Sequence, residues 1–145
     1  MNKLAILAML GLFAGCISTP WQSRIYPDHE SIGRVLYEQI ARLEKGTLRP
    51  IDLVPALQDT RVLFVDDYGI SITVRDVAFG ILDETGIEGF PNGSAPVFIC
   101  GCKVGDEWYR YHVPHLTDDE FDQTIKTIQQ AGPAYPPQGV GSADP

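Results

Sequence analysis

The chain has 145 residues, of which 44% are hydrophobic and 21% charged, and its formal net charge is −8. This composition indicates one globular domain, and it excludes a multidomain enzyme and an intrinsically disordered chain. With 11 basic residues against 19 acidic ones, the chain is not expected to bind nucleic acid, because it would neutralise a phosphate backbone poorly.

Residues 1–15 are predicted to be an export signal. Lys3 supplies a positive charge, and an apolar run of nine residues follows from Leu4 to Leu12. A bilayer-spanning helix needs about 20 apolar residues, so this run is too short to span and fits the hydrophobic region of a signal peptide.

The segment Leu12-Phe13-Ala14-Gly15-Cys16 resembles the lipobox of bacterial lipoproteins, with Phe13 where Leu is usual. The resemblance implies cleavage before Cys16, a thioether-linked diacylglycerol on Cys16, and fatty acylation, such as palmitoylation, of the new N-terminus. It also implies a lipid-anchored position in the cell envelope. Ile17 is not the Asp of inner-membrane retention, so in a Gram-negative host the outer membrane, facing the periplasm or the outside, is favoured. The alternative is an ordinary secretory signal followed by a chance cysteine.

Cleavage before Cys16 would remove Lys3 and no acidic residue, leaving 10 basic and 19 acidic residues and a net charge of −9. An anionic body gains no electrostatic hold on an anionic membrane, so lipid must provide the anchor. Residues 16–27 are then the lipidated cysteine and a short tether, in which Trp21 and Tyr26 either rest at the membrane interface or pack on the domain.

Residues 28–131 are predicted to fold as a small single α+β domain, with about three to four helices and a short antiparallel sheet. Asp28 favours a helix over 28–45, and a shorter helix is expected over 50–57. Strands are expected at 61–65 and 70–73, joined by a turn at 66–69. The remaining expected elements are a helix from Thr73 to Gly86, a loop over 86–96, a β-hairpin over 97–113, a helix that begins at the Thr117 capping box, and a disordered tail over 132–145.

Gly105-Asp106 is a pair suited to a two-residue type II′ turn, and it sets the register of the 97–113 hairpin. Cys102 then faces Tyr109 and Cys100 faces Tyr111, on one side of the hairpin. The same register places Arg110 and His112 on the opposite side.

Cys100-Gly101-Cys102 allows three interpretations. Two buried apolar residues are favoured, because free cysteine is often buried. A disulfide is the second, although strand geometry separates the two Cβ atoms by about 6–7 Å and a disulfide needs about 3.5–4.5 Å. A metal site with His112 and His115 is the third, which the register disfavours. We therefore predict no metal and no cofactor.

The chain shows no nucleophile elbow, phosphate-binding loop or dinucleotide fingerprint. Its acidic clusters fit turns and helix starts. The sequence therefore favours a membrane-anchored protein-binding or structural module over an enzyme. The alternatives are a thiol- or metal-binding envelope protein that uses the Cys-Gly-Cys segment, and an envelope hydrolase. The candidate contacts for an envelope protein partner are Phe90, Trp108, Arg110 and His112.

Overall fold

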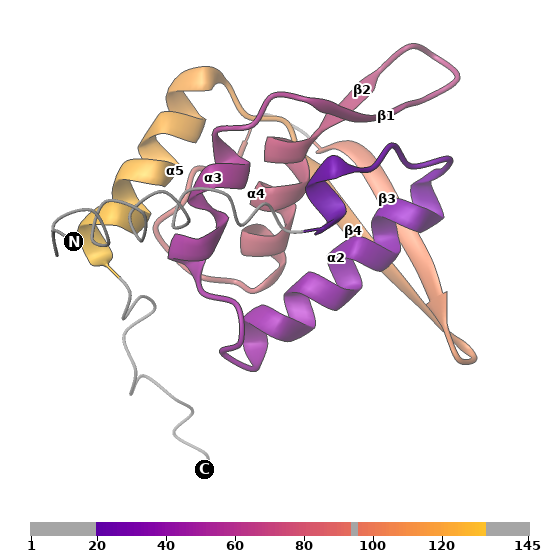
Figure 1. Ribbon diagram of the computed structural model, residues 1–145, viewed down its shortest axis with the longest axis horizontal. Coiled ribbons are helices and arrows are strands. Elements are labelled where there is room, and N and C mark those ends of the chain that lie inside the picture. Colours follow the sequence, from indigo (N-terminus) through magenta and orange to yellow (C-terminus); the bar gives the residue numbers. More distant parts are fainter. Residues whose placement is uncertain (1–19, 94–95, 133–145) are drawn as a thin grey trace, which may run out of the picture.

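The computed structural model describes residues 20–93 and 96–132 (Figure 1). This part of the chain contains four α-helices and two separate antiparallel sheets of two strands each, which confirms the predicted α+β class. The elements are the 3-10 turn η1 (Pro20–Ser23), α2 (His29–Glu44), the 3-10 turn η2 (Pro50–Leu53), α3 (Val54–Leu57), β1 (Val62–Val65), β2 (Ser71–Thr73), α4 (Val74–Glu84), β3 (Pro96–Val104), β4 (Glu107–Pro114) and α5 (Asp118–Ala131).

The helices begin where capping residues predicted them to begin. Asp28 accepts a hydrogen bond of 2.7 Å from the backbone N–H of Ser31 at the start of α2. Thr73 and Asp76 form a reciprocal capping box before α4, and Thr117 begins α5 in the same way. Each cap satisfies backbone donors that have no partner within the helix.

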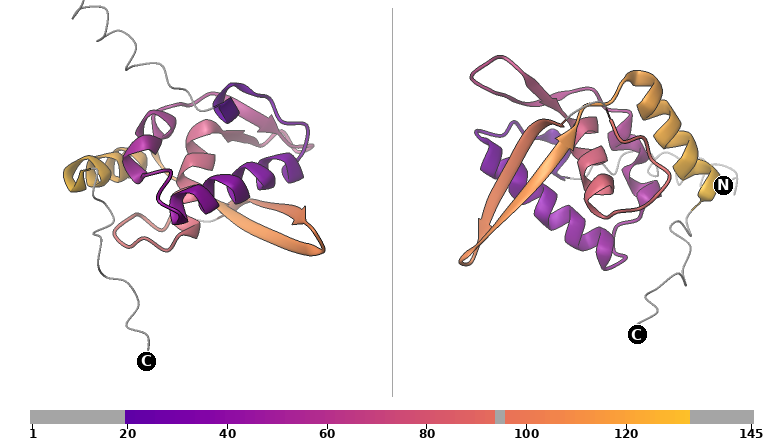
Figure 2. Two further views of the ribbon diagram at one scale, coloured as in Figure 1. Left: turned by 60° about the horizontal axis from the view of Figure 1, so that its bottom comes forward. Right: turned by 180° about the vertical axis from the view of Figure 1, so that it is seen from behind.

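Helix α4 is the centre of the core. It contacts α2, α3, β2 and β4, and both Figure 1 and Figure 2 show it between α2 and α5. Its buried residues are Val74, Val77, Ala78, Phe79, Gly80, Ile81 and Leu82. A helix that is buried on nearly all sides needs this wider apolar surface.

The β3–β4 hairpin has the predicted register. Val104 pairs with Glu107, Cys102 with Tyr109 and Cys100 with Tyr111. Gly105 has a φ of +63°, whereas Asp106, like the other non-glycine residues that the structure describes, has no positive φ, as the type II′ turn requires. Seen from behind (Figure 2, right), the hairpin lies in front of α2, and no helix covers the side that faces the viewer.

Helix α2 crosses β3 at a contact between two glycines. A Cβ atom added to Gly33 would lie 2.7 Å from both the carbonyl carbon and the carbonyl oxygen of Gly101. Real side chains do not approach backbone this closely, so the helix can lie on the strand only because residue 33 has no side chain. Ile32 and Leu36, on either side of this contact along α2, are buried.

The folded domain begins earlier than the sequence indicated. Residues 20–27 were expected to belong to the 16–27 tether, but Trp21 is only 6% exposed. The Tyr26 hydroxyl donates to the Trp21 carbonyl at 2.8 Å, and the Tyr26 N–H donates to the Leu63 carbonyl at 2.9 Å. Burial of the Trp21 ring, partial burial of the Tyr26 ring and one backbone hydrogen bond to β1 stabilise this segment on the domain.

The predicted signal over 1–15, Cys16, and residues 133–145 of the predicted tail lie outside the described residues. Among the helices that are described, none has the length and apolar character needed to cross a membrane.

Replacing Gly33 with alanine is expected to lower the free energy of unfolding by about 1–3 kcal/mol, because the new Cβ would press on the rigid backbone of Gly101. Gly80→Ala in α4 is the matched control. Its new Cβ would first meet a Leu36 side-chain carbon at 3.3 Å, which can adjust, so the change should stay below about 1 kcal/mol. Urea unfolding measures both values, and a Gly33 variant as stable as the parent chain would contradict the contact.

Candidate functional site

The two faces of the β3–β4 hairpin have opposite environments. On the inner face, which α2 and α4 cover, Cys100 and Cys102 are fully buried and Tyr111 is 7% exposed. On the other face Ile99 is 57% exposed and Trp108 is 63% exposed. We call this second side the outer face, and its exposed side chains are Ile99, Lys103, Trp108, Arg110 and His112.

Cys100 and Cys102 are free thiols and form no disulfide with each other. Burial raises the pKa of the Cys100 thiol to about 12 and also raises the pKa of the Cys102 thiol. Nucleophilic attack and metal ligation both use the thiolate, which burial disfavours here. The surroundings therefore suit two small apolar residues better than a reactive pair.

A histidine that the sequence did not single out lies beside Cys100. His29 Nδ1, on the first turn of α2, is 3.8 Å from the Cys100 sulfur. The His29 ring also packs edge-on against Phe64, with ring centroids 4.6 Å apart, and lies 5.8 Å from the ring of Phe98. No spacing rule connects residues 29 and 100, so only the packing of α2 on β3 brings them together.

The two histidines proposed as metal partners lie elsewhere. His112 is exposed on the outer face, away from the cysteines, and His115 is exposed beyond the end of β4. Over residues 20–93 and 96–132, no three His, Cys, Asp or Glu side chains lie close enough together to hold a metal ion.

Of the four residues predicted to contact a partner protein, Phe90 has a different environment from the other three. It is half-buried and packs edge-on against Phe79 of α4, with ring centroids 6.4 Å apart. Trp108, Arg110 and His112 lie together on the outer face, as the register predicted. The structure thus gathers three of the four candidates on one surface.

Side chains of α2 and α4 form hydrogen bonds with backbone groups on the two edges of this hairpin. Arg34 of α2 donates from Nη2 to the Lys103 carbonyl at 3.1 Å. Glu84 of α4 accepts from the His112 N–H at 3.1 Å. Beside β3 lies a hollow of about 670 Å³, which we call the edge groove; it is lined by His29, Glu30, Ile99, Gly101, Trp108 and Arg110.

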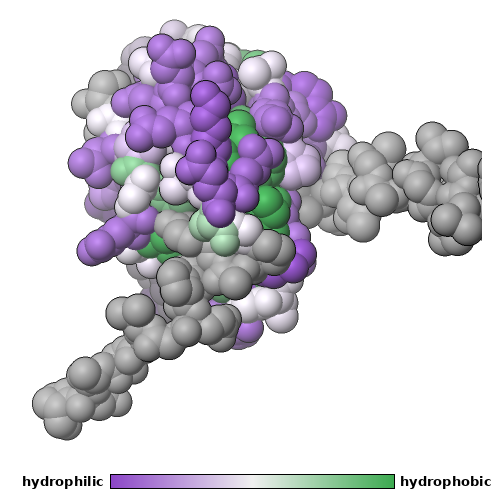
Figure 3. Space-filling model, turned by 90° about the vertical axis from the view of Figure 1, so that its left-hand side faces the viewer, coloured by the Kyte–Doolittle hydropathy of each residue, from purple (hydrophilic) through white to green (hydrophobic). Residues whose placement is uncertain are grey.

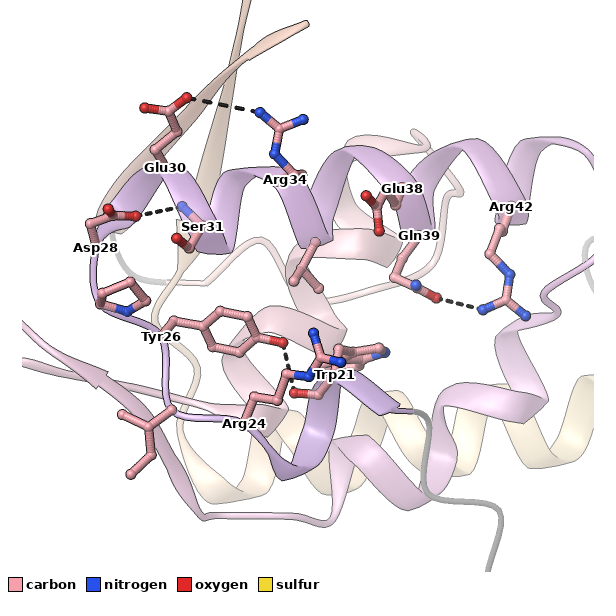
Figure 4. Close-up of a pocket in the computed structure, with 13 residues that line it drawn as sticks. Trp21, Arg24, Tyr26, Asp28, Glu30, Ser31, Arg34, Glu38, Gln39 and Arg42 are labelled. Atoms are coloured by element: carbon pink, nitrogen blue, oxygen red, sulfur yellow. Dashed lines mark hydrogen bonds and ion pairs between the residues drawn. The ribbon is translucent and has the colours of Figure 1, made fainter.

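A second hollow of about 770 Å³ lies between α2 and the segment 20–27, and we call it the helix groove (Figure 4). Its lining carries three arginines and three carboxylates. Figure 4 shows Glu30 and Arg34 together on the outward side of α2, whereas Tyr26 points toward the carbonyl of Trp21. The charged and polar side chains that line it are Arg24, Asp28, Glu30, Ser31, Arg34, Glu38, Gln39 and Arg42.

Most polar contacts in the helix groove join close neighbours in the chain. Asp28 accepts from Ser31, Arg34 lies 3.9 Å from Glu30, and Arg42 donates to Gln39 at 3.1 Å. The Asp28 hydrogen bond lowers the pKa of that carboxyl. These contacts are a helix cap and pairs spaced three or four residues apart, as an exposed helix face commonly forms.

Positive charge is unpaired on the outer face. Within the described part of the chain, Arg34, Arg49, Arg61 and Arg75 form side-chain ion pairs, whereas Lys103 and Arg110 form none, as is also true of Arg24, Arg42, Lys45 and Lys126. The side of the molecule where α5 lies is mostly hydrophilic where it is not covered by grey atoms (Figure 3), and three acidic residues begin α5. The outer face therefore combines two unpaired cations with the exposed side chains of Ile99 and Trp108.

No protein-family model, curated protein or solved structure matches this chain. The candidate surface is therefore defined by this chain's own residues, with Trp108, Ile99 and Arg110 at its centre.

We expect Cys100 and Cys102 to react with a disulfide reagent only after unfolding. A thiol whose pKa is about 12 is ionised in about one molecule in ten thousand at pH 8, and burial excludes the reagent as well. Cys100→Ala and Cys102→Ala should each leave one such thiol. Rapid labelling of the native chain, or no thiol after unfolding without reductant, would contradict two buried free cysteines.

Proposed function

We propose that this chain is a lipid-anchored cell-envelope protein whose folded domain binds another protein through the outer face of the β3–β4 hairpin. The observation that carries the proposal is Trp108, which is 63% exposed on a paired strand, beside an exposed Ile99 and an unpaired Arg110. Tryptophan and arginine are the residues most enriched among those that dominate binding at protein interfaces.

The anchor is supported by the sequence from Lys3 to Cys16. The first described element, η1, begins at Pro20, only four residues after Cys16. A fully extended segment of that length reaches about 14 Å, so a lipid on Cys16 would hold the domain close to the membrane surface. A partner in or on the same membrane would then meet the outer face at a high local concentration.

The rigidity of the hairpin supports the binding surface. Its inner face is fixed to α2 and α4 by buried side chains, so the outer residues are presented on a backbone that is already ordered. Binding to a preformed surface avoids the entropy cost of ordering a loop. The thiol- or metal-protein alternative has weaker support, because both thiols are buried and His112 faces away from them.

The proposal is tested by site-specific photocrosslinking of the full chain in the membranes of its host. His112 is replaced with p-benzoylphenylalanine, since its side chain is exposed on the outer face. We expect the protein to carry labelled fatty acid, to sediment with membranes, and to give a discrete crosslinked product with a second protein. Arg110→Glu should weaken that product several-fold, because it reverses the charge at the centre of the surface.

Two variants serve as controls. Replacing Gln123, which is exposed on α5, with the same photocrosslinker should give no such product. Cys16→Ser should lose the fatty acid and leave the membrane fraction. An unlabelled parent chain would refute the anchor, and a product that forms equally from positions 112 and 123, or that Arg110→Glu leaves unchanged, would refute the binding surface.

A further inference from the structure

The hairpin register fixes which backbone groups of β3 point away from β4. In an antiparallel pair, hydrogen-bonded and non-hydrogen-bonded residue pairs alternate. The two-residue turn makes Val104–Glu107 a hydrogen-bonded pair, so Ile99, Gly101 and Lys103 occupy non-bonded pairs. Their N–H and C=O groups therefore point toward the free edge of β3.

Two hydrogen bonds from helix side chains agree with these directions of the backbone N–H and C=O groups. The Lys103 carbonyl is reached from outside the hairpin by Arg34, and the His112 N–H is reached from outside by Glu84. Lys103 and His112 both occupy non-hydrogen-bonded pairs of the hairpin. The helices therefore satisfy one outward group on each edge.

Ile99 and Gly101 have no hydrogen-bonded closure of this kind, although Gly33 of α2 lies against the Gly101 carbonyl on the inner face. Among the described residues, neither forms a backbone hydrogen bond outside the hairpin. Both line the edge groove, which has a volume of about 670 Å³. An exposed edge of this kind is a template for another strand, and proteins usually block it with charges, proline or a covering segment.

The walls of the edge groove are also suited to an extended segment. His29 and Glu30 come from the first turn of α2, and Trp108 and Arg110 come from the outer face. A Cβ added to Gly101 would lie 3.4 Å from Cζ3 of Trp108, so the indole lies across the position that has no side chain. A strand beside β3 would contact that ring and Ile99 with its outward side chains.

The charges favour an acidic occupant. Glu30 is paired with Arg34 at 3.9 Å, whereas Arg110 and the neighbouring Lys103 form no ion pair in the described part of the chain. A second copy of β3 is disfavoured, because that strand contains Lys103 and no acidic residue. Pairing two copies would add two cations and no carboxylate to the paired strands.

We propose that the edge groove binds an extended acidic segment of the partner protein as an additional strand along β3, at Ile99 and Gly101. This inference rests on the proposed protein-binding function and adds the form of the partner. Backbone hydrogen bonds would provide affinity, and Arg110 with Lys103 would select for carboxylates.

The test uses a labelled eight-residue peptide of alternating valine and glutamate, added to the full lipidated chain in detergent and followed by fluorescence anisotropy. We expect saturable binding that falls at least about tenfold when alternate peptide nitrogens are methylated, because each lost backbone hydrogen bond contributes about 1 kcal/mol. The same peptide with lysine in place of glutamate should bind at least about tenfold more weakly.

Matched protein variants locate the contact. Ile99→Pro removes an N–H that the β3–β4 ladder does not use, so the hairpin should persist while peptide affinity falls about tenfold. Ile99→Val keeps that N–H and should bind like the parent chain. Unfolding curves confirm that both variants fold, and the methylated peptide tests the parent chain if the proline variant does not.

The outcomes separate this inference from the proposed function. No saturable binding, or equal binding by the methylated peptide, would overturn strand addition. Self-association of the parent chain that Ile99→Pro abolishes would identify a second copy as the occupant and overturn the acidic segment. A crosslinked partner that Ile99→Pro leaves intact would keep the proposed function but overturn this mode of binding.

Discussion

The contact between Gly33 and Gly101 determines how helix α2 packs on the β3–β4 hairpin. It lets α2 lie directly on β3, with no side chain between the two backbones. At this separation Cys100 and Cys102 are buried under the helix, and His29 reaches the sulfur of Cys100 at 3.8 Å. A larger residue at position 33 would separate the layers and open the core on both sides of the crossing.

The same contact helps to give the two faces of the hairpin different environments, one buried and one exposed. Because α2 and α4 cover only the inner face, Trp108 and Ile99 remain exposed on a backbone that the core holds in place. Arg34 and Glu84 reach around the strands and satisfy one backbone group on each edge. The open stretch at Ile99 and Gly101 therefore lies beside exposed aromatic and cationic side chains, which are enriched in protein interfaces.

Local chemistry allowed much of this fold to be predicted. The Gly105-Asp106 turn determined the register, and with it the opposite placement of Cys100 and Arg110. Capping residues such as Thr73 located helix starts. Contacts between distant segments could not be predicted, because no local pattern encodes them. The contact between His29 and Cys100 and the packing of Trp21 on the domain both depend on how complete elements meet.

Residue-resolved amide hydrogen exchange on the full chain, with no partner added, tests most directly whether β3 combines a closed ladder with an open edge. The account predicts strong protection at Cys100 and Cys102, whose N–H groups pair with Tyr111 and Tyr109, and fast exchange at Ile99 and Gly101. Protection at Ile99 and Gly101 equal to that of the two cysteines would show that another segment already covers the edge, and would contradict the account.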